Sequence, residues 1–206
     1  GKYRQLIAPK ISPDHEDSMW SIETKYLPED KITSLKRWLL NFSGNLDFNN
    51  NTHLSAQYSR VSDSDYFKEI VRTNTDEKTL KSFIKLTYDD KDESLSLGLL
   101  TEDEQVVNAG VPVYTRALEA SISKTFNADS KMPIKAKLVS TKFAHDTKSK
   151  TAGVRTHGDL GISRRLDIGY PLVTPKASVA FTNYSLKNNP NINRTILGSG
   201  LDIDFT

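Results

Sequence analysis

The chain has 206 residues, with 28 Lys and Arg against 26 Asp and Glu, a net charge of +2 and no cysteine. This balance argues against a dedicated nucleic-acid binder, whose basic residues dominate and cluster, and the lack of cysteine excludes disulfides and thiolate metal sites within these residues. No run of about 18 apolar residues predicts a transmembrane helix, and the length suits one large domain or two small ones.

The first expected strands lie before Pro28. Residues 2–7 fit the end of a strand, and the loop after them is broken by Pro9 and Pro13. Residues 19–27 then alternate between apolar and polar side chains, as a strand with one apolar face does. Pro28 ends this strand, because proline has no N–H to donate to a strand ladder.

The clearest pattern lies between residues 36 and 62 and predicts two strands and a turn. In residues 37–48 the even positions are apolar or glycine and most odd positions are polar, so the strand has two unlike faces. Residues 49–51, all asparagine, predict the turn, because asparagine tolerates left-handed backbone and caps its own turn. Residues 53–59 alternate in the same way. Strands of about ten residues, apolar on one face and joined by polar turns, are what a transmembrane β-barrel needs.

The rest of the chain continues the alternation. Residues 63–78 are a polar loop with room for a short helical turn, and a bend is expected near Arg164 and Arg165. Arg116 and Lys124 fall on the apolar parity of their strand, but near its ends, where long side chains reach an interface. Further strands are expected at residues 80–88, 94–101, 114–126, 133–145, 154–170, 176–186 and 196–205. The total is about ten strands and a partial one.

Two all-β architectures fit this pattern. One is a soluble sandwich with its apolar side chains turned inward. The other is an antiparallel up-and-down meander, part of a large transmembrane β-barrel. Aromatic side chains at strand ends, charges in mid-strand on the polar faces and simple hairpin succession favour the barrel.

A family resemblance rests on residues 25–31, KYLPEDK, and on residues 36–67, which begin KRWLLNFSGN and end VSDSDYF. The specific parts are a Leu-Pro-x-Asp turn, an Arg-Trp strand start and a Val-Ser-Asp-x-x-Tyr-Phe turn. In this sequence the motif residues are Pro28, Asp30, Trp38, Ser62, Asp63, Tyr66 and Phe67, with Arg194 as a weaker match further along. The chain resembles the LptD family, which assembles lipopolysaccharide at the outer membrane.

The resemblance implies transport rather than catalysis, and no cofactor. It implies a gated barrel in the outer membrane of a Gram-negative bacterium, which receives lipopolysaccharide from a periplasmic bridge and releases it into the outer leaflet. An LptE-like lipoprotein would plug the lumen, and the Lpt bridge would be reached through an N-terminal domain outside these residues. The competing function is a soluble all-β module that binds a carbohydrate-type ligand.

The chain also departs from the family. Ala117 and Leu118 stand where family members usually carry a proline after the Tyr-x-Arg of that strand. The family's periplasmic jellyroll, its cysteines, its first barrel strand and its closing strands are not matched. We therefore expect residues 1–206 to be a partial outer-membrane β-barrel domain, internal to a larger barrel. The wall of a wide barrel has the wrong stagger to close early, so we expect an open sheet without a ladder between its first and last strands.

Polar side chains on the non-apolar parity are the residues expected to face the lumen. They are Arg37, Asn41, Asn45, Asp47, Lys135, Lys137, Arg155, His157 and Asp159. Basic members of this set suit lipopolysaccharide phosphates through charge-assisted bonds, although a solvated wall is the favoured interpretation. No catalytic, metal or cofactor site is expected, because the four histidines share no ligand spacing.

Overall fold

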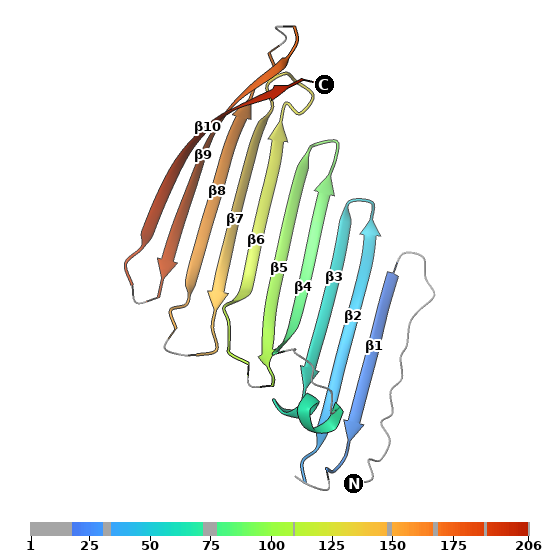
Figure 1. The fold of residues 1–206 in the computed structure, drawn as a ribbon. Coiled ribbons are helices and arrows are strands. Elements are labelled where there is room, and N and C mark those ends of the chain that lie inside the picture. The colour runs from blue at the N-terminus through green and yellow to red at the C-terminus, as the bar shows by residue number, and fades with distance from the viewer. Residues whose placement is uncertain are drawn as a thin grey trace. The chain divides into compact units, whose positions relative to one another are not determined.

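The structure, a computed structural model, describes residues 18–30, 34–71, 78–108, 110–147, 150–166, 169–187 and 189–205. Within these residues, ten strands form one sheet in the order of the sequence (Figure 1). A single helical turn, η1 (Phe67–Val71), follows the third strand. The strands are β1 (Ser18–Leu27), β2 (Arg37–Asn49), β3 (Thr52–Val61), β4 (Thr79–Asp90), β5 (Leu95–Val106), β6 (Thr115–Phe126), β7 (Ile134–Ala144), β8 (Gly153–Ser163), β9 (Leu172–Leu186) and β10 (Ile192–Asp204).

The expected architecture is confirmed. The strands form an antiparallel up-and-down meander, and among the described strands no ladder joins β1 to β10. A two-sheet sandwich is wrong for the described residues, because they contain one sheet and no second layer. The short helical turn expected between residues 63 and 78 is η1. The partial strand expected at residues 2–7 lies outside the described residues.

The expected strand boundaries differ from the structure between the end of β8 and the start of β9. The strand expected at residues 154–170 ends at Ser163, where the bend was expected. The backbone N–H of Arg164 donates to the carbonyl of Pro175 at 3.1 Å, and Leu166 forms an isolated bridge with Val173. Strand β9 begins at Leu172, four residues before the expected start at Lys176, and it includes Pro175, because a proline carbonyl still accepts a hydrogen bond.

The turn between β2 and β3 forms as expected. The side-chain oxygen of Asn49 accepts the backbone N–H of Asn51 at 2.9 Å, which closes the turn locally. Strand β10 begins at Ile192, four residues earlier than expected, because Ile192 pairs with Tyr184 on β9. Strand pairing extends the element beyond the stretch that alternates in sequence.

The register of the first three strands places like side chains together. Ser21, Ser43 and Gln57 are cross-strand partners, and so are Glu23, Asn41 and Ser59. The intervening side chains, such as the partners Phe42 and Tyr58, belong to the opposite face. Large apolar side chains remain exposed there, because no second layer covers them in the described residues. The expected alternation of faces is confirmed in these strands.

Two cations expected on the apolar parity of β6 find carboxylate partners. Arg116 bonds Glu102 through its Nε at 2.8 Å, and Lys124 bonds Glu93 at 3.0 Å. Lys124 also lies 5.8 Å from the ring centre of Phe126. Their charges are thus compensated near the two ends of the strand.

The chain divides into two compact units, with parts of β4, β5 and β6 in each. The first unit contains a small apolar cluster of Leu39, Val61, Tyr66, Leu80 and Val107, with Phe67 and Ile70 packed against it. This cluster lies where β2 and β3 meet η1, at one end of the strands. No helix among the described residues is long and apolar enough to cross a membrane.

A charge should be tolerated unequally on the two faces of β2. Leu46 lies on the apolar face and Asn45, one residue away, on the polar face. In a barrel wall, Leu46→Arg should cost up to about 2–4 kcal/mol, the range for a lipid-facing cation near the midplane, and Asn45→Arg far less. Refolding free energies of both variants of the full barrel in lipid measure this difference. Equal losses would contradict the assigned faces.

Candidate functional site

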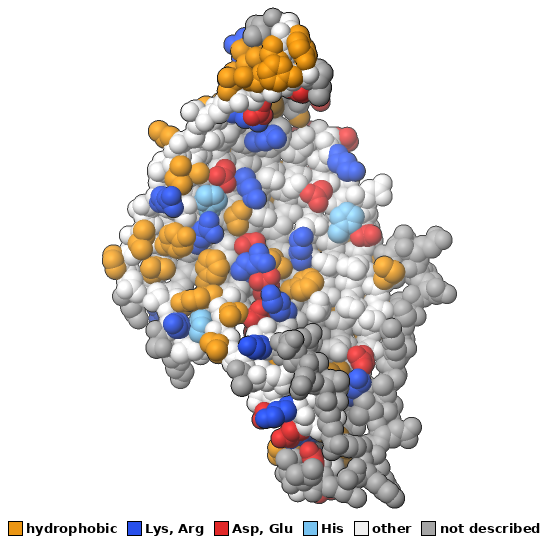
Figure 2. Space-filling view, in the orientation of Figure 1, with side chains coloured by type: hydrophobic (Ala, Val, Ile, Leu, Met, Phe, Trp, Pro, Cys, Tyr) orange, Lys and Arg blue, Asp and Glu red, His pale blue; other side chains and the backbone are white. Residues whose placement is uncertain are grey.

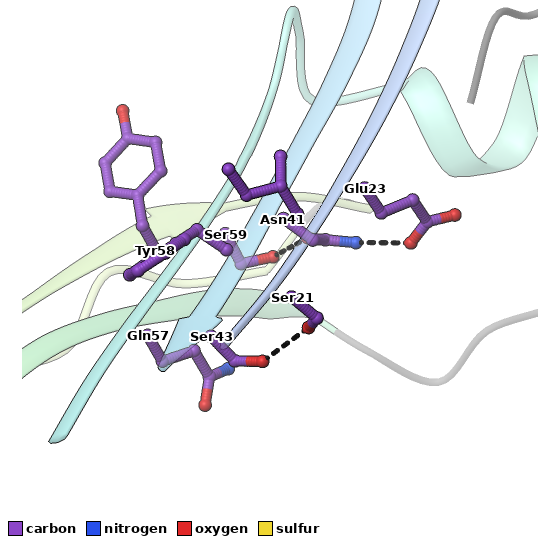
Figure 3. A pocket seen from close by; sticks show the side chains of 9 residues that line it. Ser21, Glu23, Asn41, Ser43, Gln57, Tyr58 and Ser59 are labelled. Carbon is purple, nitrogen blue, oxygen red and sulfur yellow. Dashed lines mark hydrogen bonds between the residues drawn. The ribbon is translucent and has the colours of Figure 1, made fainter. Parts of the chain in front are cut away.

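The polar face of β1, β2 and β3 contains a hollow of about 590 Å³ (Figure 3). Its polar lining is Ser21, Glu23, Asn41, Ser43, Gln57 and Ser59. The Ser59 hydroxyl donates to the Asn41 side-chain oxygen at 2.7 Å, and the Asn41 amide donates to Glu23 at 3.1 Å. Figure 3 also shows Ser21 and Ser43 in contact, 2.8 Å apart. The strands therefore present a connected layer of hydroxyl, amide and carboxylate groups.

Charges on this face are paired within the wall. Glu23 forms an ion pair with Lys25 at 2.9 Å on the same strand. Asp47 contacts the Nδ1 of His53 at 2.6 Å, close to the β2–β3 turn. Asn41, Asn45 and Asp47, all expected to face the lumen, share this face in the observed register. The face thus offers hydrogen bonds rather than a net charge of one sign.

Arg37, another residue expected to face the lumen, is 2% exposed and lies among acidic groups. Its Nη1 is 3.0 Å from Asp63, its Nε is 3.5 Å from Asp30, and its Nη2 contacts Glu69. These three carboxylates come from the connection before β2, the loop after β3 and the helical turn η1. One guanidinium therefore ties three segments together at the end of the sheet. We call this the Arg37 cluster.

The loop after β3 is shaped by the same cluster. Asp63 accepts the backbone N–H of Asp65 at 3.1 Å and the Ser62 hydroxyl at 2.6 Å. The N–H of Ser62 donates to the carbonyl of Trp38 at 2.9 Å, which continues the β2–β3 pairing into the loop. The Tyr66 ring meets Phe67 edge-on, with centroids 5.5 Å apart.

Most motif residues on which the resemblance rests thus meet in one place. Asp30, Ser62, Asp63, Tyr66 and Phe67 belong to the Arg37 cluster or pack beside it. Trp38 contributes its backbone carbonyl, while Pro28 is exposed nearby in sequence. Arg194 lies elsewhere, on β10, as the cross-strand partner of Thr182. The motif is chiefly a structural arrangement that closes one end of the strands.

Tyr66 is 2% exposed, and its environment changes its acidity. Burial raises the pKa of the Tyr66 phenol, and the negative charges of Glu23 and Asp63 raise the pKa further. Each cause penalises the tyrosinate anion. The cluster therefore favours a neutral phenol beside its carboxylates.

A second polar face is formed by β7, β8 and β9. The Nδ1 of His157 is 2.7 Å from the Thr182 hydroxyl, and its Nε2 is 3.0 Å from Asp159. Arg155 stacks on the Tyr184 ring at 6.0 Å. The register places Arg155, His157 and Asp159 on one face, as expected from their parity.

Lys135 and Lys137 border a hollow of about 370 Å³ on this second face. Asp159, the cross-strand partner of Lys137, and Ser178 also line it. Both lysines are exposed and so remain accessible to an anionic group. Figure 2 shows charged side chains of both signs scattered among hydrophobic ones on the face in view.

Sequence reasoning missed two polar residues that the structure makes important. Glu69 supplies the third carboxylate of the Arg37 cluster, and Gln105 bonds the backbone of Val61 from another strand. Neither residue lies in a recognisable motif, and the alternation of apolar and polar residues along a strand does not predict contacts between residues that are far apart in the chain. Among the described residues, no group of three or more histidine or acidic side chains is arranged to hold a metal ion.

A single-layer antiparallel sheet with one hydrogen-bonding face and one exposed apolar face is the wall of a β-barrel membrane protein. The family model for LptD, LPS transport system D, matches residues 36–202, and no curated protein matches the chain. The chain belongs to the LptD family. This is a family of outer-membrane transport proteins for lipopolysaccharide, not a family of enzymes.

Removing the buried guanidinium should destabilise the barrel strongly. Arg37→Met leaves three acidic side chains without their cation, and breaking a buried ion pair in this way costs about 3–5 kcal/mol. The control is Lys124→Met, which removes an exposed pair with Glu93 and should cost about 0–1 kcal/mol. Unfolding free energies of the full barrel in lipid compare the two. Similar losses would show that the cluster contributes no more than a surface pair.

Tyr66 should make stability depend on alkaline pH. Because the pKa of its phenol is raised on folding, its stabilisation is fully present below about pH 10, the ordinary tyrosine value. It is lost as pH rises from there through the pKa of the folded state. Unfolding free energies should therefore fall more steeply above about pH 10 in the unsubstituted barrel than in Tyr66→Phe. Parallel curves would contradict the assigned environment.

Proposed function

We propose that this chain forms part of the barrel wall through which lipopolysaccharide reaches the outer leaflet of the outer membrane. The observation that best supports this function is a sheet with two unlike faces and no second layer in the described residues, in a chain of the LptD family. Such a sheet is stable only where one face meets lipid and the other meets water. A soluble carbohydrate-binding module would instead need to cover its apolar face.

In this proposal the polar faces line the lumen and the apolar parity contacts lipid. Support comes from the hydrogen-bonded layer around Asn41 and from the exposed apolar side chains on the opposite parity, such as Leu138 and Leu160. The lumen-facing set is Arg37, Asn41, Asn45, Asp47, Lys135, Lys137, Arg155, His157 and Asp159. Within it, Arg37 serves as a structural anchor, because its charge is already neutralised by three carboxylates.

We further propose that residues 1–206 belong to a larger barrel. Every described side chain of β10 is exposed, Leu197 by 81%, and among the described strands only β9 pairs with it. An alternating strand with one unpaired edge invites a further strand. In the complete barrel, strands outside this segment would pair with the edges of β1 and β10 that no described strand occupies.

The chemistry of the polar faces indicates which partners they would bind. Lys135 and Lys137 border an open hollow and suit the phosphates of lipopolysaccharide, by charge-assisted bonds. The amide and hydroxyl layer of β1 to β3 suits a lumenal plug of the LptE kind, because it offers hydrogen bonds without a net charge. The periplasmic Lpt bridge would be reached through a domain outside this segment.

Site-specific photocrosslinking in cells tests this proposal with neighbouring pairs of positions. A crosslinker at Asn45 or Lys137 should capture the plug or lipopolysaccharide in transit, whereas one at Leu46 or Leu138, which faces membrane lipid, should not capture the plug. The two positions of each pair are adjacent in sequence and lie on opposite faces, so they are matched in depth in the membrane. Capture of the plug from the apolar positions alone would overturn the proposed orientation. Capture of lipopolysaccharide from neither Asn45 nor Lys137 would overturn the proposed path.

A further inference from the structure

The apolar face of β7 to β10 changes character partway along the strands. Its side chains alternate with those of the polar face, on which His157 bonds Thr182. On the apolar face the ring of Phe181 lies over Gly158, where an added Cβ would collide with it. Other apolar side chains of this face are Ile134, Ala136, Leu138, Leu160, Ile162, Val173, Val179, Leu197, Leu201 and Ile203.

One row across this face is polar on all four strands. Ser140 is the cross-strand partner of Thr156, and Thr156 is the partner of Asn183. Asn183 is in turn the partner of Asn193. The hydroxyls of Ser140 and Thr156 lie 3.3 Å apart, and the Asn183 amide donates to the side-chain oxygen of Asn193 at 2.5 Å. Lys142, two residues beyond Ser140, belongs to the same face and is exposed. We call these five residues, all in the second unit, the polar band.

The polar band lies near one end of the strands only. It is on the side of the connection between β7 and β8. Toward the opposite end, the same face stays apolar as far as Ile134, Ile162, Val173 and Ile203. Hydrocarbon offers no partner to a hydroxyl or an amide, so exposing such groups to it costs free energy. The hydrocarbon layer of a membrane should therefore end between the row of Leu138 and the polar band.

The first unit, taken by itself, changes in a similar way at its own strand ends. Tyr26 and Trp38, beside the connection between β1 and β2, are cross-strand partners and are 47% and 38% exposed. Tyrosine and tryptophan rings favour the level of the lipid headgroups. On β3, Tyr58 is followed on the same face by Arg60, which forms an ion pair with Asp103. This face too becomes polar toward the end of its strands.

The lengths of the connections indicate which membrane surface lies at these strand ends. In the alternating meander, the connections on this side include residues 28–36 and 62–78, whereas those on the opposite side include residues 50–51 and 91–94. In bacterial outer-membrane barrels the short turns lie in the periplasm and the longer loops lie outside. The polar band therefore belongs to the outer surface, at the level of the headgroups of the outer leaflet.

We propose that the polar band binds the sugar and phosphate headgroups of lipopolysaccharide in the outer leaflet, on the outside of the wall. This inference rests on the proposed function, because it takes the apolar face as the lipid-facing surface of a barrel. Hydroxyl and amide groups suit sugar hydroxyls, and one bond between Asn183 and Asn193 leaves both amides with further donor and acceptor sites. Lys142 suits a phosphate. Unlike the hollow beside Lys135 and Lys137, the band would hold lipopolysaccharide that has already been delivered.

Cysteine labelling of the full barrel in intact cells tests the position of the polar band. The 206 residues contain no cysteine, so an introduced one is compared with the unsubstituted barrel as background. A maleimide that does not cross membranes should label Asn193→Cys about tenfold faster than Leu197→Cys, because a thiol ionises in water and not in hydrocarbon. The two positions are matched, since they lie four residues apart on the same face of β10.

The outcomes separate this inference from the proposed function. Equally fast labelling of both positions would overturn both, because the apolar face would then meet water. Labelling of neither would overturn the polar band alone, since the band would then lie in hydrocarbon or toward the periplasm. If Asn193→Cys fails to assemble, Asn183→Cys against Phe181→Cys gives the same comparison on β9.

Unfolding rates test the ligand. The full barrel is placed in phosphatidylcholine vesicles with and without lipopolysaccharide, which should slow unfolding because it binds the folded state. Combining Asn183→Leu, Asn193→Leu and Lys142→Gln should reduce this slowing about twofold to tenfold, the range for one hydrogen bond. Ser199→Leu, on the same face of β10 at the apolar level, is the control and should keep the full slowing. Full slowing in the triple variant, or an equal reduction in the control, would overturn the proposal.

Discussion

The structure depends on one constraint, which is that backbone hydrogen bonds between neighbouring strands must hold a sheet that no second layer covers in the described part of the chain. In a sandwich, apolar faces bury one another and share that task. Here the buried apolar cluster is confined to Leu39, Val61, Tyr66, Leu80 and Val107, at one end of the first unit. Along the rest of the described strands the apolar side chains are mostly half-buried or exposed. The fold therefore requires an apolar surrounding on one face, which a membrane supplies.

The end of such a sheet needs its own closure, because strand alternation stops there and loop backbone must find partners. The Arg37 cluster meets this need with charge. A buried guanidinium is tolerable only beside anions, and the segments before β2 and after β3 supply them through Asp30, Asp63 and Glu69. This explains why motif residues far apart in the sequence act together, and why they describe a structural joint rather than a binding site.

In the proposed function, the two faces have different roles in a transport wall. The polar face pairs its charges internally, as in His157 with Asp159 and Glu23 with Lys25, and offers hydroxyl and amide groups to the lipid that we propose passes along it. A wall without a strong charge of one sign can contact a large amphiphile without holding it tightly.

The sequence by itself determined the number of strands, the two-faced pattern and the asparagine turn, because parity and turn chemistry act over a few residues. It misplaced the start of β9, because the ladder tolerates Pro175 through its carbonyl. Only the tertiary structure decided that Arg37 is buried among acids and that Gln105 bonds Val61, 44 residues away in the chain. Such contacts depend on how loops and strand edges meet in space. The local periodicity of the sequence therefore does not predict these contacts.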